Sequence, residues 1–176
     1  EQGAEWAIAK GYGTRDDLQR TESYGRIAGA NAGAVDARAK ERGRPQLGSL
    51  GAGNHFLEID VVDEIYDPAI AEAFGLMRDC VVVQIHCGSR GLGHEVCGQY
   101  LHVLQDAPRK YGINIPDREL VAAPVDSREG RDYLAAMTAA ANYAFANRQI
   151  LAHFVRRAFE QVLAGKVRDW HLHQVY

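Results

Sequence analysis

Residues 50–60 read LGAGNHFLEID and residues 81–93 read VVVQIHCGSRGLG, and these two stretches determine the fold that we expect. Each joins a glycine-rich loop to a short run of strand-forming residues, with the loop first in one and last in the other. The run 81–85 is almost continuously apolar, which is typical of a buried strand. His55 therefore stands at the start of the first expected strand and His86 at the end of the second.

Alternation along the first strand separates its residues into two sets. Asn54, Phe56 and Glu58 would share one face. His55 would point to the other face, so we expect it to serve different neighbours. A strand of about six residues is roughly 20 Å long. His55 and His86 could therefore bind one metal ion only if the strands run antiparallel or are not direct neighbours.

The rest of the chain is predicted to be mainly helical. Ser127 is a good helix N-cap, and the apolar periodicity after it predicts a helix of about 50 Å that Gly165 closes. Shorter helices are expected over residues 5–9, 15–20, 34–42 and 69–74, and after Gly93. Residues 170–176 alternate, which predicts a strand with His171 and His173 on one face. The expected fold class is α+β, with an antiparallel or mixed sheet core covered by helices.

Some residues inside the predicted helices have both structural and functional interpretations. Asn142, Asn147 and Arg148 lie in an alanine-rich surround. They are either exposed or part of a polar face that lines a ligand groove. Cys97 falls on an apolar stripe, which favours a small buried hydrophobic residue over a nucleophile.

The composition of the 176-residue chain is that of an ordinary globular protein of about one domain. Apolar residues make up 47% and charged residues 24%, which disfavours disorder, and no apolar run approaches the roughly 18 to 20 residues that span a bilayer. The net charge of -3 gives no general attraction to nucleic acid but leaves room for a local basic groove. Three cysteines without CxxC spacing argue against a disulfide framework or a structural zinc site, so we expect a cytoplasmic location.

The two loops carry the residues with the clearest chemistry. The two strand-end histidines suit Mn, Fe or Zn, but a catalytic metal needs three or more protein ligands. Asn54 and Glu58 could hydrogen-bond a planar polar ligand while the Phe56 ring stacks on it. Arg90 and the N–H groups of its loop would suit a phosphate. Taken singly, each is also explained as a turn residue or a satisfied core group.

The two motifs together resemble those of a known family. GAGNHFLEI followed by HCGSRGLG closely resembles the RtcB family, which comprises GTP- and manganese-dependent RNA ligases. These enzymes join a 3'-phosphate or 2',3'-cyclic phosphate end of RNA to a 5'-hydroxyl end. The segments EQGAEWAIAKGYGTRDDLQRTE and YLAAMTAAANYAFANRQ are also similar to family segments, so the resemblance covers most of the chain.

The resemblance implies two manganese ligands, His55 and His86, and an RNA phosphate contact at Arg90. It also implies a guanine-nucleotide site at five consecutive residues, Asn54, His55, Phe56, Leu57 and Glu58. In the family's mechanism GTP guanylylates a histidine, GMP passes to the RNA 3'-phosphate, and the 5'-hydroxyl then displaces it. The implied cofactors are Mn2+ and GTP, and the implied substrate is RNA, either tRNA halves or broken RNA. An activating protein partner is left open, and no membrane is implied.

Departures from the family pattern limit what the chain is expected to do alone. An Asp-x-x-Cys metal segment is expected upstream of Glu1, a further histidine ligand just beyond Tyr176, and the guanylylated histidine farther on. Residues 1–176 are therefore expected to be a single domain fragment, the central part of a catalytic domain, without ligase activity in isolation. Cys87 stands where the family often has serine, and we interpret it as a tolerated small residue rather than a soft metal ligand.

Two other functional classes remain open at this point. One is a non-catalytic module that binds RNA or a nucleotide. The other is a metal-dependent hydrolase that uses the same histidines, which predicts a metal-activated water and no requirement for GTP.

Overall fold

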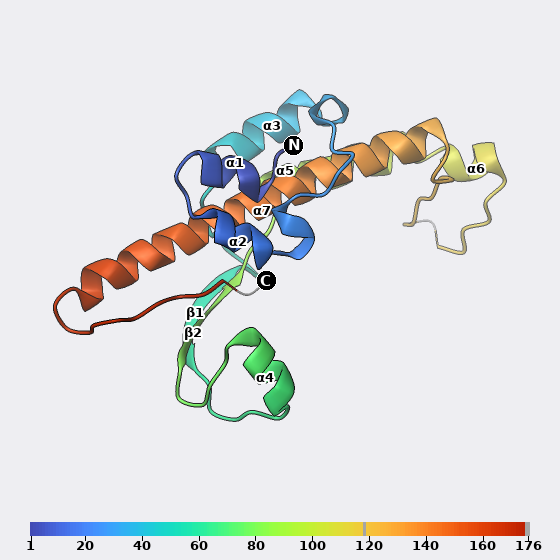
Figure 1. Cartoon of the computed structure of the whole chain (residues 1–176). Helices are drawn as coiled ribbons and strands as arrows, with labels where there is room; N and C mark the ends of the chain where they lie inside the picture. Colours follow the sequence, from blue (N-terminus) through green and yellow to red (C-terminus); the bar gives the residue numbers. More distant parts are fainter. Residues whose placement is uncertain (118, 175–176) are drawn as a thin grey trace.

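Helix α7 (Arg128–Leu163) is the axis of the structure, a computed structural model that describes residues 1–117 and 119–174 (Figure 1). Its 36 residues span about 54 Å at the usual rise per residue. Ser127 caps the helix, since its Oγ accepts a hydrogen bond from the Gly130 N–H at 3.0 Å, which confirms the predicted start. Within the described part of the chain, no helix is both long and apolar enough to cross a lipid bilayer.

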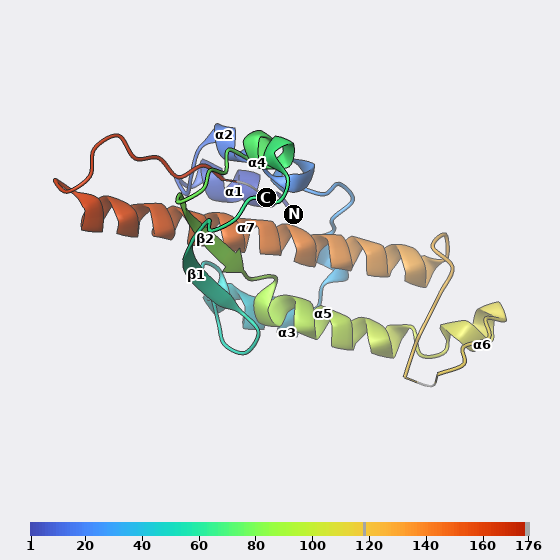
Figure 2. The same cartoon turned by 90° about the horizontal axis from the view of Figure 1, so that it is seen from below.

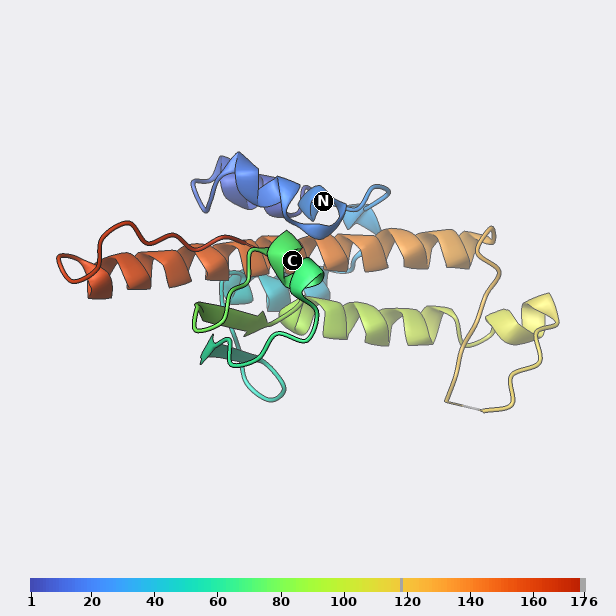
Figure 3. The ribbon, with the colours of Figure 1, turned by 60° about the horizontal axis from the view of Figure 1, so that its bottom comes forward.

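Other helices pack on two opposite sides of α7 (Figures 2 and 3). On one side lie the short N-terminal helices α1 (Ala4–Ala9) and α2 (Arg15–Gln19). On the other side lie α3 (Ala37–Gly43) and α5 (Arg90–Val103), which also pack on each other. The short helices expected before residue 46 are thus confirmed, and α5 begins three residues earlier than predicted.

The larger hydrophobic cluster lies between α3, α5 and α7. Ala39 of α3 and Ala136 of α7 are fully buried there, and their small side chains let the helices approach closely. The Tyr100 ring of α5 fills the space beside them. Its hydroxyl donates a hydrogen bond of 2.9 Å to the Ala34 carbonyl, so burial leaves no unpaired hydroxyl.

The buried face of α5 is narrower than its sequence suggests. Its buried residues recur every four positions, at Val96, Tyr100 and Leu104, the last just beyond the helix end. Cys97 lies one position to the side and is exposed. The predicted burial of Cys97 is therefore wrong, because Cys97 borders an open hollow between α5 and α7 that Tyr133 and Met137 also line.

Strands β1 (Phe56–Val61) and β2 (Val81–His86) form an antiparallel pair. The register runs from Phe56 opposite His86 to Val61 opposite Val81. Helix α4 (Pro68–Phe74) lies in the connection between them, and Asp67 caps it by accepting hydrogen bonds from two backbone N–H groups. The α+β class, the antiparallel pairing and the long helix are all confirmed.

Strand β2 is less buried than its apolar sequence predicts. Val81 is 48% exposed and the remaining residues of the strand are exposed or half-buried. The reason is that the sheet, over the described residues, has only two strands. A largely apolar cavity of about 410 Å³ separates β2 from α4 and α7.

Residues 164–174 turn back along α7 (Figure 1). The strand predicted for this region is wrong for residues 170–174, which have no strand pairing, and residues 175–176 lie outside the described part. Its two histidines are still neighbours, since the ring centroids of His171 and His173 are 4.4 Å apart. The remaining elements are helix α6 (Ala107–Tyr111) and three short 3₁₀ turns, at Glu22–Gly25, Ala32–Ala34 and Arg44–Gln46.

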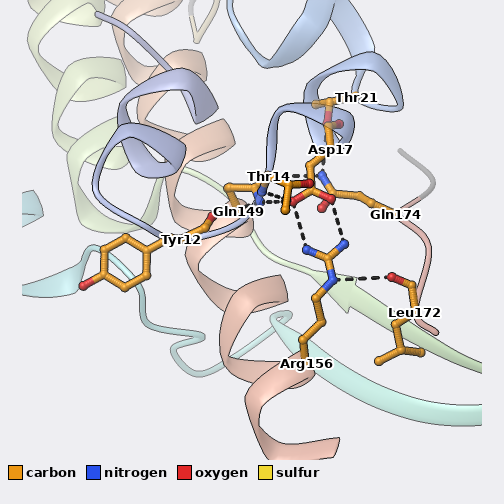
Figure 4. A network of polar contacts seen from close by, with 8 residues as sticks. All are labelled: Tyr12, Thr14, Asp17, Thr21, Gln149, Arg156, Leu172 and Gln174. Atoms are coloured by element: carbon orange, nitrogen blue, oxygen red, sulfur yellow. Dashed lines mark hydrogen bonds and ion pairs between the residues drawn. The ribbon is translucent and has the colours of Figure 1, made fainter. Parts of the chain in front are cut away.

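A buried polar network ties α7 to the N-terminal segment and to the returning segment (Figure 4). The Arg156 guanidinium donates two hydrogen bonds of 2.9 Å to the Asp17 carboxylate, whose side chain is only 8% exposed. Gln149 Nε2 and the Thr14 N–H donate to the same carboxylate at 2.9 and 3.0 Å. Arg156 Nε also donates to the Leu172 carbonyl at 3.4 Å, which holds the returning segment against α7.

The Asp17 carboxylate is kept charged by these partners. Burial by itself would raise the pKa of Asp17, because it disfavours the charged form. Hydrogen bonds from Arg156, the Thr14 N–H and Gln149, together with the charge of Arg156, outweigh burial and hold the pKa below its ordinary value of 3.8. Asp17 and Arg156 therefore form an ion pair at neutral pH.

Three carboxamides on α7 are almost completely buried, namely Asn142, Asn147 and Gln149. Asn142 was expected to be either exposed or part of a ligand groove. Instead its carboxamide binds the backbone of the N-terminal segment, with hydrogen bonds of 2.8 Å to the Ile27 N–H, the Ile27 carbonyl and the Glu1 carbonyl. The polar residues of this alanine-rich helix thus serve as attachment points for loops.

Candidate functional site

The antiparallel register brings the two candidate histidine ligands to the same end of the strand pair. His86 is directly opposite Phe56, and His55 immediately precedes Phe56. The Phe56 and His86 rings stack, with centroids 4.9 Å apart and planes within 12°. His86 therefore lies on the face that carries Phe56 and Glu58, since residues directly opposite each other share a face. Alternation within the first strand separated only His55 from this set, and the register adds that His86 shares the face of Phe56 and Glu58.

The imidazole of His55 is oriented by its own loop. Its Nδ1 lies 3.0 Å from the Ala52 carbonyl and 3.5 Å from Nη1 of Arg90. These two contacts require opposite tautomers, because a carbonyl only accepts and a guanidinium only donates a hydrogen bond. The shorter contact is the better hydrogen bond, and it places the proton on Nδ1. The lone pair of Nε2 is then available for a ligand.

Arg90 lies between the two motif loops. It opens α5 with a left-handed φ of 52°. Its Nε donates to Ser49 Oγ at 3.3 Å, and its guanidinium packs directly against Gly51. A Cβ at position 51 would lie 2.1 Å from Arg90 Nη1, and Gly51 also has a φ of +95°. The backbone therefore favours glycine at position 51, and any larger residue would also require the Arg90 guanidinium to move.

The loop after β2 is held by α7. Arg148 Nη1 donates to the Cys87 carbonyl at 2.9 Å. The Cys87 thiol is buried and accepts a hydrogen bond from Asn147 Nδ2 at 3.2 Å, while it lies 3.3 Å from the Leu50 carbonyl. These contacts occupy the sulfur with α7 and with the first loop, which favours a packing role for Cys87 over a ligand role.

The phenol of Tyr143 lies on the buried side of the site, where Arg90 and Cys87 influence it, and it is neutral. Its hydroxyl donates to the Gly43 carbonyl at 2.8 Å. Burial raises the pKa of Tyr143 to about 12, the charge of Arg90 opposes the shift, and Cys87 adds to it. The phenol thus stays protonated at neutral pH and serves as a hydrogen-bond donor.

The predicted nucleotide-binding residues divide between two faces of β1. Asn54 and Glu58 are exposed, and Phe56 is half-buried beneath the His86 ring. Leu57 is directly opposite Ile85, on the face turned away from His86. Phe56 and Glu58 therefore lie on one side of β1, as the alternation predicts, and Leu57 lies on the other, while Asn54 is in the loop that precedes the strand.

The cavity behind β2 lies on the other face of the strand pair. Most of the β2 residues that line it, such as Val83 and Ile85, alternate with His86. His171 and His173 line this cavity as well. Burial and the neighbouring His171, with Arg20 and Arg156 farther away, lower the pKa of His173. This histidine pair is thus separated by the sheet from the side on which His86 lies.

The donor set fits a manganese ion in part. A ligand imidazole in proteins usually donates its other ring N–H to a carbonyl, as His55 does to Ala52. Among the described residues, however, no group of three or more His, Cys, Asp or Glu side chains could hold a metal ion. Within the part of the chain that the structure describes, the candidate site therefore offers two imidazoles, His55 and His86, which is fewer than the three protein ligands of a catalytic metal site.

Sequence reasoning missed Gln46 and Ser49, which support this site from behind, and it named Asn147 and Arg148 without their supporting role. Ser49 contacts Arg90, and Gln46 Oε1 accepts a hydrogen bond of 2.7 Å from the Gly91 N–H. Asn147 and Arg148 reach the loop that follows β2. The available signal was the presence of adjacent polar residues in an alanine-rich helix, but their partners are distant in sequence.

Comparison with known proteins identifies the family. The family model described as tRNA-splicing ligase RtcB matches residues 1–176. The tRNA-splicing ligase RtcB of Thermococcus kodakarensis is 53% identical over 174 residues, which are 99% of this chain and 36% of the relative. The tRNA-splicing ligase RtcB of Archaeoglobus fulgidus is 51% identical over 175 residues, which are 99% of this chain and 36% of the relative. That of Methanococcus maripaludis is 47% identical over 176 residues, which are 100% of this chain and 37% of the relative. The chain spans about a third of the length of these relatives. It belongs to the RtcB family of tRNA-splicing ligases.

Proposed function

We propose that this chain is part of a GTP- and manganese-dependent RNA ligase that joins 3'-phosphate or 2',3'-cyclic phosphate ends of RNA to 5'-hydroxyl ends. The reaction would pass through a guanylylated enzyme and an RNA-GMP intermediate. The observation that carries the proposal is the convergence of His55, His86 and Arg90, from two loops, at one end of the strand pair. Membership of the RtcB family supports it.

Each residue has a proposed role that follows from its surroundings. His55 and His86 would be manganese ligands, and the metal would neutralise phosphate charge. The Ala52 carbonyl holds the His55 ring in the tautomer that leaves Nε2 free. Arg90, fixed at the start of α5, would hold an RNA phosphate.

The guanine nucleotide would lie along residues 54–58. Glu58 offers an exposed hydrogen-bonding group on the face of β1 that carries the Phe56 ring, and Asn54 offers another from the loop just before the strand. Leu57 would contribute through its backbone, because its side chain is on the opposite face. His55 would contact the nucleotide from the metal side.

The wider setting is also a proposal. Residues 1–176 would form a single domain, the central part of the catalytic domain, and would not ligate RNA in isolation. The complete protein would act in the cytoplasm on tRNA halves or broken RNA, with an activating protein as an open question.

The test is guanylylation of the complete protein. It is incubated with labelled GTP, with and without Mn2+, and the protein is examined for a covalent GMP adduct. We expect a manganese-dependent adduct that His55→Ala and His86→Ala abolish together with manganese binding. Normal manganese stoichiometry in both variants would overturn the site assignment. Absence of an adduct from folded, manganese-loaded wild-type protein would favour a hydrolase or a binding module instead.

A further inference from the structure

Asn147 is the most completely buried polar residue beside the candidate site. It lies in the middle of α7 with no exposed surface. Its Oδ1 accepts hydrogen bonds from the N–H groups of Gly48 and Ser49, at 2.6 and 3.2 Å. The acceptor side of the carboxamide thus holds the loop that leads to His55.

The donor side of the same carboxamide reaches both motif loops. Asn147 Nδ2 lies 3.2 Å from three acceptors, the Ser49 carbonyl, the Gly88 carbonyl and the Cys87 sulfur. Ser49 belongs to the loop before β1, whereas Cys87 and Gly88 directly follow His86. One planar group therefore joins the two loops that carry the candidate ligands.

An asparagine carboxamide suits these contacts because its oxygen accepts hydrogen bonds while its nitrogen donates them. The two loops present backbone N–H groups on one side and carbonyls on the other, so the side chain must both accept and donate. An aspartate would accept but not donate, and an apolar residue would leave buried backbone groups unpaired. The adjacent Arg148 adds a hydrogen bond to the Cys87 carbonyl, so α7 holds the second loop at two points.

We propose that Asn147 is a positioning residue that fixes the His55 and His86 loops relative to each other and so preorganises the metal site. It touches neither ligand side chain and acts through the loop backbones. This inference rests on the proposed function, because preorganisation is measured as manganese affinity. Support of a ligand from outside the first coordination sphere is typically worth about 10- to 100-fold in metal affinity.

Asn142 provides a matched control on the same helix. Its carboxamide is 1% exposed, compared with 0% for Asn147. It also forms short hydrogen bonds to loop backbone, but to Ile27 and Glu1 in the N-terminal segment. Removal of either carboxamide is therefore expected to cost similar stability, and only removal of Asn147 should disturb the motif loops.

The experiment uses the complete protein as wild type, Asn147→Ala and Asn142→Ala. Mn2+ is titrated into metal-free protein and the free ion is followed by electron paramagnetic resonance. Thermal unfolding of the same samples reports stability. We expect both variants to unfold at lower temperature, Asn147→Ala to bind manganese about 10- to 100-fold more weakly, and Asn142→Ala to bind it within about twofold of wild type. Wild-type affinity in Asn147→Ala, or an equal loss in Asn142→Ala, would overturn the inference.

Amide hydrogen exchange on the metal-free samples separates this inference from the proposed function. Asn147→Ala should speed exchange in the two motif loops, while Asn142→Ala should speed it near Ile27. Unchanged exchange in the motif loops would overturn the positioning role even if manganese binds. If the wild-type protein binds no manganese, the proposed function is wrong. The proposal that Asn147 preorganises a metal site is then wrong as well.

If Asn147→Ala does not fold, the pair Asn147→Asp and Asn142→Asp replaces it. Aspartate has nearly the same shape and keeps the acceptor contacts to Gly48 and Ser49 while it removes the donors. The expected outcome is the same: weaker manganese binding in Asn147→Asp only. Equal affinities in the two aspartate variants would contradict the proposal.

Discussion

Two polar clusters lie against α7, and they differ in how their charged and polar groups are paired. At Asp17 both carboxylate oxygens are buried and bonded, by Arg156, Gln149 and the Thr14 N–H. At the strand end, His86 is exposed and its ring contact is a stack on Phe56. His55 has one ring nitrogen on a carbonyl and the other available.

The difference separates a structural cluster from a candidate site. A network whose groups are fully paired has nothing left with which to bind a ligand, and it acts as an attachment between segments. A cluster that keeps ring nitrogens and a guanidinium at an accessible surface can still bind one. In this molecule both ends of the Asn147 carboxamide behind the candidate site are hydrogen-bonded, while the groups at the front of the site keep binding capacity.

The largest expected effect comes from breaking the saturated cluster. Arg156→Ala would leave the buried Asp17 carboxylate without its cation, and such a loss costs about 3–5 kcal/mol of unfolding free energy. Urea unfolding of the complete protein measures it. The adjacent Arg157→Ala is the control, since its ion pair with Glu160 is exposed and is expected to contribute less than about 1 kcal/mol. Equal losses in the two variants would show that Asp17 is stabilised by its other partners alone.

The same cluster predicts a dependence of stability on acid pH. Because the pKa of Asp17 is lower in the folded than in the unfolded protein, its contribution is complete above the unfolded value of 3.8 and is lost as the pH falls through the folded pKa. The urea midpoint of the wild type should therefore fall more steeply than that of Asp17→Asn as the pH is lowered below about 4. Parallel curves would contradict the ion pair.

Arg90→Ala tests the open cluster. We expect roughly tenfold weaker RNA binding and a salt dependence reduced by about one phosphate contact. Formation of the enzyme-GMP adduct should be largely intact, because Arg90 is assigned to RNA and not to the nucleotide. RNA affinity is measured at several salt concentrations, with Arg157→Ala as an exposed-arginine control. Loss of the adduct would place Arg90 in the nucleotide site instead.

The smallest expected effect is a difference in RNA affinity between alanine substitutions at two glycines of the loop before β1. Gly51 and Gly53 have φ angles of +95° and +78°, so alanine at either should cost about 1–2 kcal/mol in stability. Only at Gly51 would the new Cβ overlap the Arg90 guanidinium. Gly51→Ala should therefore also weaken RNA binding, and Gly53→Ala should not. Equal RNA affinities would show that Arg90 adapts without loss.

Much of the fold was predictable because its signals are local. Ser127 as a cap, the alanine-rich periodicity that follows and the Asp67-Pro68 helix start are all encoded within a few residues. A shared metal required strands that are antiparallel or not direct neighbours, and the observed pairing is antiparallel. The family resemblance supplied the candidate site residues, and the loops that carry His55 and His86 lie at one end of the strand pair.

What the sequence could not supply depends on partners far along the chain. The roles of Asn142 and Asn147 are set by backbone groups about 100 residues away, so their own neighbours in sequence gave no indication of burial. His86 faces Phe56 because of the register, which alternation within one strand does not define. Cys97 is exposed because α5 and α7 leave an open hollow beside it, which the periodicity of one helix does not reveal.

The attachment of both motif loops to one residue late in the chain has a consequence during synthesis. Gly48 precedes Asn147 by 99 residues and Gly88 precedes it by 59. At about 5–20 residues per second, the ribosome delivers Asn147 roughly 3 to 20 s after these loops. Until then the segment with His55 and His86 lacks the group that joins its loops, so the two loops cannot reach their final arrangement before α7 has been translated.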